Sequence, residues 1–171
     1  MKVLLLNGSP RKNGCTYTAL NVVADALKAE GIDAEVFQAG DPDMENVKAA
    51  AAKLKDSDAL VVGSPVYWAS PSGQIIEFMD RLASVAEKDM LYKPAAAVAS
   101  ARRAGTTATL DVLTKYFSYH QMPVVSSCYW NMVHGNTPEE VMKDEEGVQI
   151  MRVLGKNMAW LLKCIEAGKK N

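Results

Sequence analysis

Glycine, hydroxyl and basic residues directly follow the first apolar segment of the chain, and this combination suits an anion site. The segment Lys2–Asn7 runs into Gly8–Thr16, which reads Gly-Ser-Pro-Arg-Lys-Asn-Gly-Cys-Thr. Small residues let a backbone approach a ligand closely, and free N–H groups at the start of a helix bind phosphate oxygens. Arg11 adds a fork of donors that matches phosphate geometry. We predict that this loop binds a phosphate group, with a plain helix-capping turn as the alternative.

The cysteine in this loop raises the question of metal or redox chemistry. Cys15, Cys128 and Cys164 lie far apart, no Cys-x-x-Cys pair occurs, and three cysteines give no disulfide framework. Three thiols also fall short of the four that usually hold an iron–sulfur cluster. The start of a helix can lower a thiol pKa, but a bound phosphate would bring negative charge beside Cys15 and block access to it. We predict no metal site and interpret Cys15 as a small residue that lends its backbone amide.

A second loop, Gly63–Gly73, combines rigid backbone with aromatic side chains. Pro65 and Pro71 stiffen the loop, and Tyr67 and Trp68 lie at its centre. Exposed aromatic rings beside a rigid backbone suit a flat ring ligand. The alternative is that both side chains fill the core or a subunit contact.

A third loop, Ser100–Thr107, again joins a strand-like segment to a helical one. It contains the pair Arg102 and Arg103, followed by Gly105 and Thr106. Its backbone amides suit the polar edge of a heterocycle. The alternative is that the two arginines form a solvated surface pair.

The alternation of apolar and helical segments predicts where these loops lie. Strand-like segments alternate with helical ones, and the last helical segment is long, with one apolar stripe from Ile150 to Ile165. This alternation predicts an α/β fold with a parallel sheet covered by helices on both faces. Ligands bind such sheets at the carboxyl ends of the strands, so the loops after strands one, three and four should form one mononucleotide site. The predicted strands are Lys2–Asn7, Ala34–Gln38, Ala59–Gly63, Ala95–Ala99 and Pro123–Ser126, and the predicted helices are one from about Thr16, Met44–Lys55, Gln74–Val85 and Thr107–Tyr119, with Asn131–Pro138 as an irregular loop.

Composition narrows the class of protein and of partner. With 171 residues, 49% of them hydrophobic, the chain suits one domain spanning residues 1–171. Its 19 basic and 20 acidic residues leave a net charge of −1, which does not indicate nucleic acid or an anionic membrane as partner. The apolar run after Lys2 is too short for a signal peptide, and no run is long enough to span a membrane. We expect a soluble cytoplasmic protein.

The three loops together resemble the NADPH-dependent FMN reductase family of the flavodoxin-like superfamily. The resemblance extends from the first strand to at least His134–Gly135. It implies a flavodoxin-like, doubly wound sheet of five parallel strands in the order 2-1-3-4-5, with helices on both faces. Iron–sulfur flavoproteins share the first motif but carry a compact cysteine cluster, and the comparable segment near Asp41–Met44 has no cysteine. Cluster chemistry is therefore not expected.

The resemblance also assigns roles to residues in each loop. The expected contacts with the FMN phosphate are Ser9, Arg11, Asn13, Gly14, Cys15 and Thr16; those that border the isoalloxazine are Pro65, Val66, Tyr67 and Trp68; those at its pyrimidine edge are Arg103, Gly105 and Thr106. Trp68, Trp130 and His134 are expected to shape the substrate side of the flavin. An ordinary loop histidine is the alternative for His134, and His120 is expected to serve as a charge at a helix end.

The implied activity is an FMN-dependent NAD(P)H oxidoreductase. A nicotinamide would pass hydride to the flavin, which would reduce a quinone, free flavin or another small molecule. Since the flavin carries the difficult chemistry, no catalytic side chain is predicted. The alternatives are an FMN-binding electron-transfer protein with a protein partner and a nucleotide-binding regulatory module without flavin. A homodimer or homotetramer is expected, with contacts around Tyr92, Tyr129 and Asn131–Gly135; the acceptor and the choice of NADPH or NADH stay open.

Overall fold

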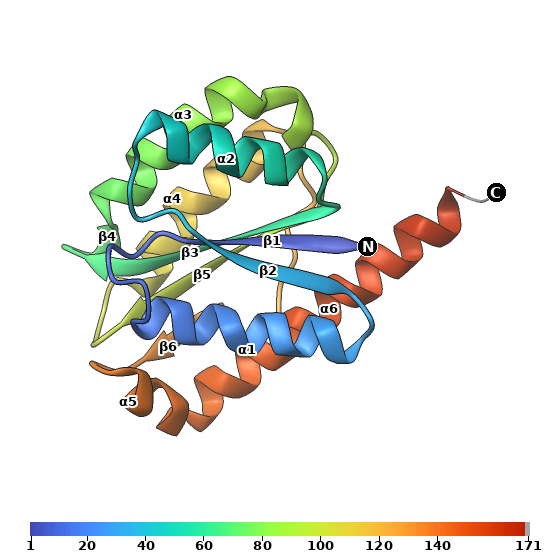
Figure 1. Cartoon of the computed structure of the whole chain (residues 1–171). Coiled ribbons are helices and arrows are strands. Elements are labelled where there is room, and N and C mark those ends of the chain that lie inside the picture. Colours follow the sequence, from blue (N-terminus) through green and yellow to red (C-terminus); the bar gives the residue numbers. More distant parts are fainter. Residues whose placement is uncertain (170–171) are drawn as a thin grey trace.

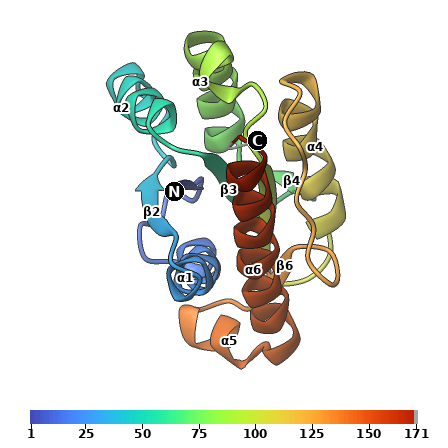
Figure 2. The ribbon, with the colours of Figure 1, turned by 90° about the vertical axis from the view of Figure 1, so that its right-hand side faces the viewer.

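A computed structural model describes residues 1–169 and shows a sheet between two layers of helices (Figures 1 and 2). The strands are β1 (Lys2–Asn7), β2 (Asp33–Gln38), β3 (Ala59–Tyr67), β4 (Ser70–Pro71), β5 (Ala95–Ala101) and β6 (Met132–His134). The helices are α1 (Cys15–Ala29), α2 (Met44–Lys55), α3 (Gly73–Met90), α4 (Thr106–Tyr119), α5 (Pro138–Lys143) and α6 (Glu145–Gly168). Parallel strands follow the order β2-β1-β3-β5-β6, which confirms the predicted topology.

Side chains of β1 show how the sheet divides the core. Val3 and Leu5 pack into a cluster with residues of α1 and α6, whereas Leu4 and Leu6 pack into a second cluster with residues of α2, α3 and α4. All four are fully buried. Each such side chain contributes about 1.5–3 kcal/mol by leaving water, so β1 is held firmly from both faces. The loop that follows it therefore starts from a rigid position.

The position predicted for the fifth strand was wrong. Within Pro123–Ser126 there is one isolated bridge, between Val124 and Ala95, and regular pairing with β5 resumes only at β6. The Ser127 hydroxyl donates to the Tyr129 carbonyl at 2.7 Å and accepts from the Tyr129 N–H at 3.3 Å. Such local bonds compete with a strand ladder, so the chain leaves the sheet edge here. The edge strand comes instead from the region predicted as an irregular loop.

Two other elements were not predicted. Residues 67–70 form a tight hairpin between β3 and β4, which pair antiparallel. The short helix α5 begins after Thr137, whose hydroxyl accepts from the Glu140 N–H, and has proline in its first turn. Along residues 1–169, no helix has both the length and the hydropathy needed to cross a membrane.

The loops after β1, β3 and β5 all lie at the carboxyl edge of the sheet, on the left of Figure 1. The helix that follows the first loop starts at Cys15, one residue before the predicted start. Its predicted apolar stripe, including Leu20, Val23 and Leu27, is buried. This packing directs the start of α1 toward the edge where the other two loops lie.

Candidate functional site

A buried asparagine hydrogen-bonds the backbone of the first loop. Asn7, the last residue of β1, is fully buried, and its Oδ1 accepts from the Ser9 N–H at 3.2 Å. Its Nδ2 lies 3.4 Å from the Arg11 carbonyl oxygen and 3.2 Å from that of Lys12, and donates to Gln38 Oε1 at 2.8 Å. Gln38 Nε2 in turn donates to the Ser9 carbonyl at 2.6 Å. The loop carbonyls are thus turned toward the protein interior.

Two further carbonyls of the loop are also held. The Ser72 hydroxyl donates to the Gly8 carbonyl at 2.9 Å. The Gly14 carbonyl accepts from both the backbone N–H and the hydroxyl of Thr18, at 3.0 and 3.1 Å. These contacts fix both ends of the loop.

The amide groups of the same segment are left available. Within residues 1–169, the N–H groups of residues 12–17 donate to no other residue. They include the first N–H groups of α1, which lack helical partners and lie at the positive end of the helix dipole. A run of free N–H groups at a helix start is an anion site. We call residues 8–17 the anion cradle.

A buried hydroxyl pair joins the cradle to the third loop. Thr16 Oγ1 and Ser100 Oγ lie 2.7 Å apart, and both residues are buried. Thr16 is the second residue of α1, and Ser100 lies near the carboxyl end of β5. This contact holds the first and third loops at a fixed separation.

The hairpin after β3 supplies the aromatic side of the site. Trp68 and Ala69 have φ values of 53° and 57°, so the two-residue turn has left-handed backbone at both positions, as in a type I′ turn. Side chains other than glycine are strained there, by about 1 kcal/mol each. The Trp68 side chain is completely exposed. Gly105, at φ 103°, lies so close beneath the turn that a Cβ would approach the Ala69 Cα to 2.7 Å.

One cleft of about 190 Å³ brings the three loops together. Its lining contains Ser9, Arg11, Cys15 and Thr16 from the first loop, Pro65, Val66 and Tyr67 from the second, Ser100, Ala101 and Arg102 from the third, and Gly135 and Asn136 after β6. The remaining predicted cofactor residues are in the same loops but outside this lining: Asn13, Gly14, Trp68, Arg103, Gly105 and Thr106. Arg102, rather than the predicted Arg103, lines the cleft.

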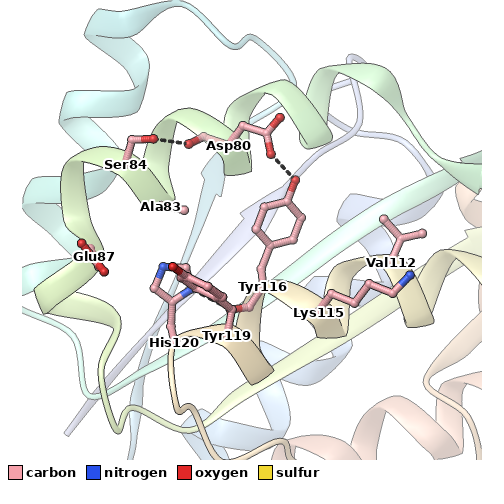
Figure 3. A pocket seen from close by; sticks show the side chains of 9 residues that line it. All are labelled: Asp80, Ala83, Ser84, Glu87, Val112, Lys115, Tyr116, Tyr119 and His120. Carbon is pink, nitrogen blue, oxygen red and sulfur yellow. Dashed lines mark hydrogen bonds between the residues drawn. The ribbon is translucent and has the colours of Figure 1, made fainter.

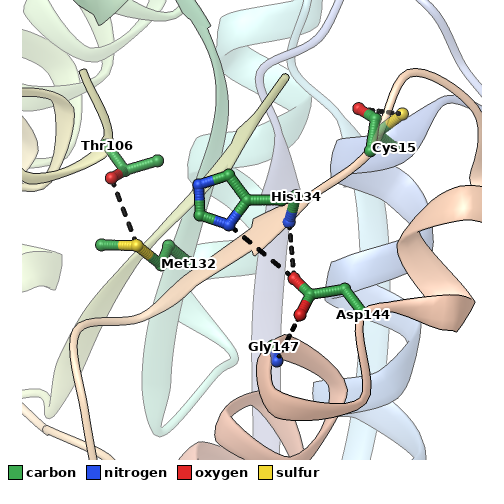
Figure 4. Close-up of polar contacts among 7 residues, drawn as sticks. Cys15, Thr106, Met132, His134, Asp144 and Gly147 are labelled. Atoms are coloured by element: carbon green, nitrogen blue, oxygen red, sulfur yellow. Dashed lines mark hydrogen bonds and ion pairs between the residues drawn. The ribbon is translucent and has the colours of Figure 1, made fainter. Parts of the chain in front are cut away.

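The predicted substrate residues Trp130 and His134 also lie outside this lining. The Trp130 ring packs edge-on against Tyr129, with ring centroids 4.6 Å apart. The His134 N–H donates to Asp144 Oδ2 at 2.7 Å, and its ring Nδ1 is 3.8 Å from the same oxygen (Figure 4). Asp144 also caps α6 by accepting from the Gly147 N–H at 3.0 Å. These contacts fix the end of β6.

Cys15 contacts the segment after β6. Its Sγ lies 3.6 Å from the Gly135 carbonyl oxygen. Burial raises the pKa of the Cys15 thiol, and the nearby Arg11 charge opposes this only in part. The thiol is therefore protonated at neutral pH, which suits a packing residue better than a redox nucleophile.

Several site residues were not singled out from the sequence. Asn7 precedes the first predicted loop and Ser100 begins the third. Arg102 was named in the third loop, but no cofactor contact was predicted for it. Gly135 and Asn136 follow the strand whose position was mispredicted. One signal was present for Asn7, since a polar residue ends an otherwise apolar buried strand. The others depend on strand pairing, which the sequence does not show.

A larger groove of about 680 Å³ lies between α3 and α4, and no residue of the loops after β1, β3 and β5 lines it (Figure 3). The Tyr116 hydroxyl donates to the Asp80 carboxylate there, and burial together with that carboxylate raises the pKa of Tyr116. His120 is buried with its Nδ1 2.7 Å from the Tyr116 carbonyl oxygen. The groove has no run of free amides, so the smaller cleft is the candidate site.

The described part of the chain contains no cluster of three or more His, Cys, Asp or Glu side chains able to hold a metal ion. Cys15 is half-buried, while Cys128 and Cys164 are exposed, and all three are free.

Comparisons with known proteins identify the family of the chain. The family model for NADPH-dependent FMN reductase matches residues 1–137, which include the cradle, the hairpin and the third loop. The chain belongs to this family. An iron–sulfur flavoprotein of Methanocaldococcus jannaschii is 28% identical, with 97% of this chain and all of the relative covered. An NADPH azoreductase of Bacillus sp. (strain OY1-2) is 30% identical over 59% of each chain.

A solved structure shows the same fold. A flavodoxin from the domain Archaea superposes with a TM-score of 0.74 and 18% identity, with 95% of this chain and 99% of the flavodoxin covered. FMN is the cofactor, with NADPH or NADH as electron donor, and the chain is an FMN-dependent oxidoreductase. The free amides of the anion cradle fit the FMN phosphate, whereas the dispersed cysteines do not fit the cluster named in the M. jannaschii relative.

Proposed function

We propose that this FMN reductase family member transfers electrons from NADPH or NADH to a small acceptor such as a quinone or free flavin. The observation that carries the proposal is one cleft lined both by residues of the anion cradle, whose amides are free, and by Pro65, Val66 and the aromatic Tyr67. Bound FMN supplies the hydride and electron transfer chemistry, and the protein supplies binding, orientation and electrostatics.

At the phosphate end, the anion cradle binds and orients the cofactor. The amides of residues 12–17 donate to phosphate oxygens, and Arg11 adds a charged fork from the exposed side of the loop. Hydrogen bonds to charged groups contribute about 1.5–3 kcal/mol each. The Ser9 hydroxyl, which accepts from the Arg11 N–H at 3.1 Å, fixes the turn that carries this arginine.

At the ring end, the chain forms a wall and leaves one side accessible. Pro65, Val66 and Tyr67 border the flavin ring, and Arg102 with the amides of the third loop binds its polar edge. Trp68 lies at the tip of the hairpin, where an aromatic acceptor can stack on it. His134 is the sheet partner of Ala101, which lines the cleft, and is proposed to contact the acceptor. The predicted contact between Trp130 and the acceptor stays a prediction.

Steady-state turnover tests this proposal. FMN-loaded protein should oxidise NADPH or NADH when menadione is present, and the rate should depend on both substrates. Protein that retains FMN but shows no turnover with either nucleotide would contradict the reductase proposal. It would favour an electron-transfer protein that works with a protein partner.

We also propose that the chain forms a homodimer or homotetramer. Three aromatic side chains, Tyr92, Tyr129 and Trp130, are 69%, 52% and 56% exposed. Exposed aromatic residues are enriched in protein–protein interfaces. Multi-angle light scattering should give a mass of two or four chains; a monomer across the accessible concentration range would refute this.

A further inference from the structure

We propose that Asn7 is a positioning residue that aims the amides of the anion cradle at the cofactor phosphate. It does not touch the ligand, since it is fully buried and all its contacts are with the protein. The proposal deepens the function above and rests on it, because it assumes that the cradle holds the phosphate of FMN.

The geometry of the peptide bond explains how a buried side chain can aim exposed groups. In a trans peptide, the carbonyl of one residue and the N–H of the next lie in one plane and point in opposite directions. Asn7 Nδ2 draws the Arg11 carbonyl inward, so the Lys12 N–H points outward. It also draws the Lys12 carbonyl inward, so the Asn13 N–H points outward. Both of these N–H groups are free of protein partners in the described chain.

The remaining loop carbonyls follow the same logic. The Gly14 carbonyl is held by Thr18, which directs the Cys15 N–H the opposite way. The Ser9 carbonyl is held by Gln38, and the next residue, Pro10, has no N–H to direct. With any other residue at position 10, the inward Ser9 carbonyl would leave the N–H of residue 10 pointing outward, away from the helix start. Proline removes that donor.

Gln38 fixes which way the Asn7 side chain is turned. The two residues are partners in the β1–β2 register, so the sheet places their side chains together. Because Gln38 Nε2 donates to the Ser9 carbonyl, its Oε1 is the atom that faces Asn7. Asn7 must then present Nδ2 to Gln38 and Oδ1 to the Ser9 N–H, which is the orientation that also directs Nδ2 toward the two carbonyls.

This arrangement predicts a selective effect on ligands. FMN uses the cradle through its phosphate, whereas riboflavin has the same ring system and no phosphate. Without Asn7, the carbonyls of Arg11 and Lys12 are free to turn outward, which removes two donors and places negative dipoles beside the anion. Loss of preorganised, charge-assisted bonds should weaken FMN binding by about 30- to 100-fold and change riboflavin binding by less than about threefold.

The experiment measures the dissociation constants of FMN and riboflavin by flavin fluorescence. Asn7→Leu removes the hydrogen bonds at similar volume, and Asn7→Ser is the second variant in case leucine prevents folding. Asn131→Leu is the matched control, because Asn131 is also buried and its Oδ1 has no partner in the described chain. A ¹⁵N NMR titration with FMN adds a direct readout, in which the Lys12 and Asn13 amide signals should shift in the unaltered protein and shift less in Asn7→Ser.

The expected result is selective loss of FMN affinity in the Asn7 variants and unchanged binding of both ligands in Asn131→Leu. The proposal is overturned if FMN affinity of the Asn7 variants stays within threefold of the unaltered protein. It is also overturned if both ligands weaken equally, which would show only a structural role. Failure of the unaltered protein to bind FMN at all would instead refute the proposed function, and this inference with it.

Discussion

The two ends of the cleft are built in opposite ways. At the phosphate end, the anion cradle presents backbone amides whose directions are fixed by fully buried Asn7 and by Gln38. At the ring end, the hairpin presents side chains on a strained turn, with Trp68 completely exposed. One end is a preorganised backbone site, and the other is an accessible side-chain surface.

This difference separates two tasks. A cofactor that stays bound benefits from donors that are already in place, because less ordering free energy is then spent on binding. An acceptor that binds and leaves needs an accessible surface, and strain at such sites is commonly functional. We therefore expect changes at the cradle to alter FMN affinity, and changes at the hairpin to alter acceptor kinetics and stability.

The largest expected effect comes from Gly40→Ala. A Cβ at Gly40 would lie 2.0 Å from the Ser9 carbonyl oxygen, so this backbone must move. The displacement should weaken FMN binding by about 100-fold, or ~2.7 kcal/mol, and lower the free energy of unfolding by about 2–3 kcal/mol. Fluorescence titration and urea unfolding measure the two effects.

Gly73→Ala is the control for this substitution, because a Cβ at Gly73 would meet no heavy atom within 4 Å other than those of its chain neighbours and of its own helix backbone. It should leave FMN affinity unchanged. Equal FMN affinity in Gly40→Ala and the unaltered protein would show that the position of the Ser9 carbonyl does not matter.

Arg11→Ala should have the next largest effect. The exposed guanidinium lines the cleft at its phosphate end. Removing it should weaken FMN binding by about 10- to 50-fold, the equivalent of one strong charge-assisted contact, and leave riboflavin binding unchanged. Arg152→Ala, at an exposed position on α6, controls for net charge. Unchanged FMN affinity in Arg11→Ala would refute the role given to this side chain.

In the hairpin, a substitution is expected to raise the stability of the protein rather than lower it. Trp68→Asn combined with Ala69→Gly places the residues favoured in type I′ turns at both strained positions. The double variant should gain about 1 kcal/mol of stability, raising Tm by about 3 °C, and should raise the KM for an aromatic acceptor. The ratio of FMN to riboflavin affinity should not change.

The single variant Ala69→Gly separates the two contributions to this result. It should keep the acceptor KM because Trp68 is retained, while gaining part of the stability. A double variant with the unaltered KM would mean that Trp68 plays no part in acceptor binding.

Cys15→Ser should have the smallest effect. The residue contributes its backbone amide, so FMN affinity should change by less than about threefold. Because burial raises the pKa of its thiol from the ordinary 9.0, Cys15 should react with iodoacetamide more slowly than exposed Cys128 and Cys164 at neutral pH. Mass spectrometry of alkylated peptides measures these rates, and a Cys15 that reacts first would contradict this interpretation.

Much of the fold was predictable from local pattern. The buried strands β1, β3 and β5 each contain a short apolar run, and α2 and the buried stripe of α1 follow helical spacing. The edge strand was not predictable in this way. Pro123–Ser126 has the composition of a strand, but the Ser127 side chain bonds locally to Tyr129 and the chain leaves the sheet there. Pairing at an edge depends on neighbours that a local pattern does not contain.

The sequence predicted which loops form the candidate site, but it predicted less well which residues of those loops line the cleft. Glycine, proline and arginine marked the three loops, and the sheet brings them to one cleft. The role of Asn7 depends on its register with Gln38, and the choice between Arg102 and Arg103 depends on where β5 ends, at Ala101. Both are consequences of strand pairing across long sequence separations.

FMN uptake followed by anaerobic reduction tests the central claim most directly. Protein stripped of ligand is mixed with FMN, desalted, and its visible absorbance is recorded before and after NADPH or NADH is added. The account predicts one flavin retained per chain and bleaching of its absorbance by the nicotinamide. A protein that stays colourless after exposure to FMN would contradict it.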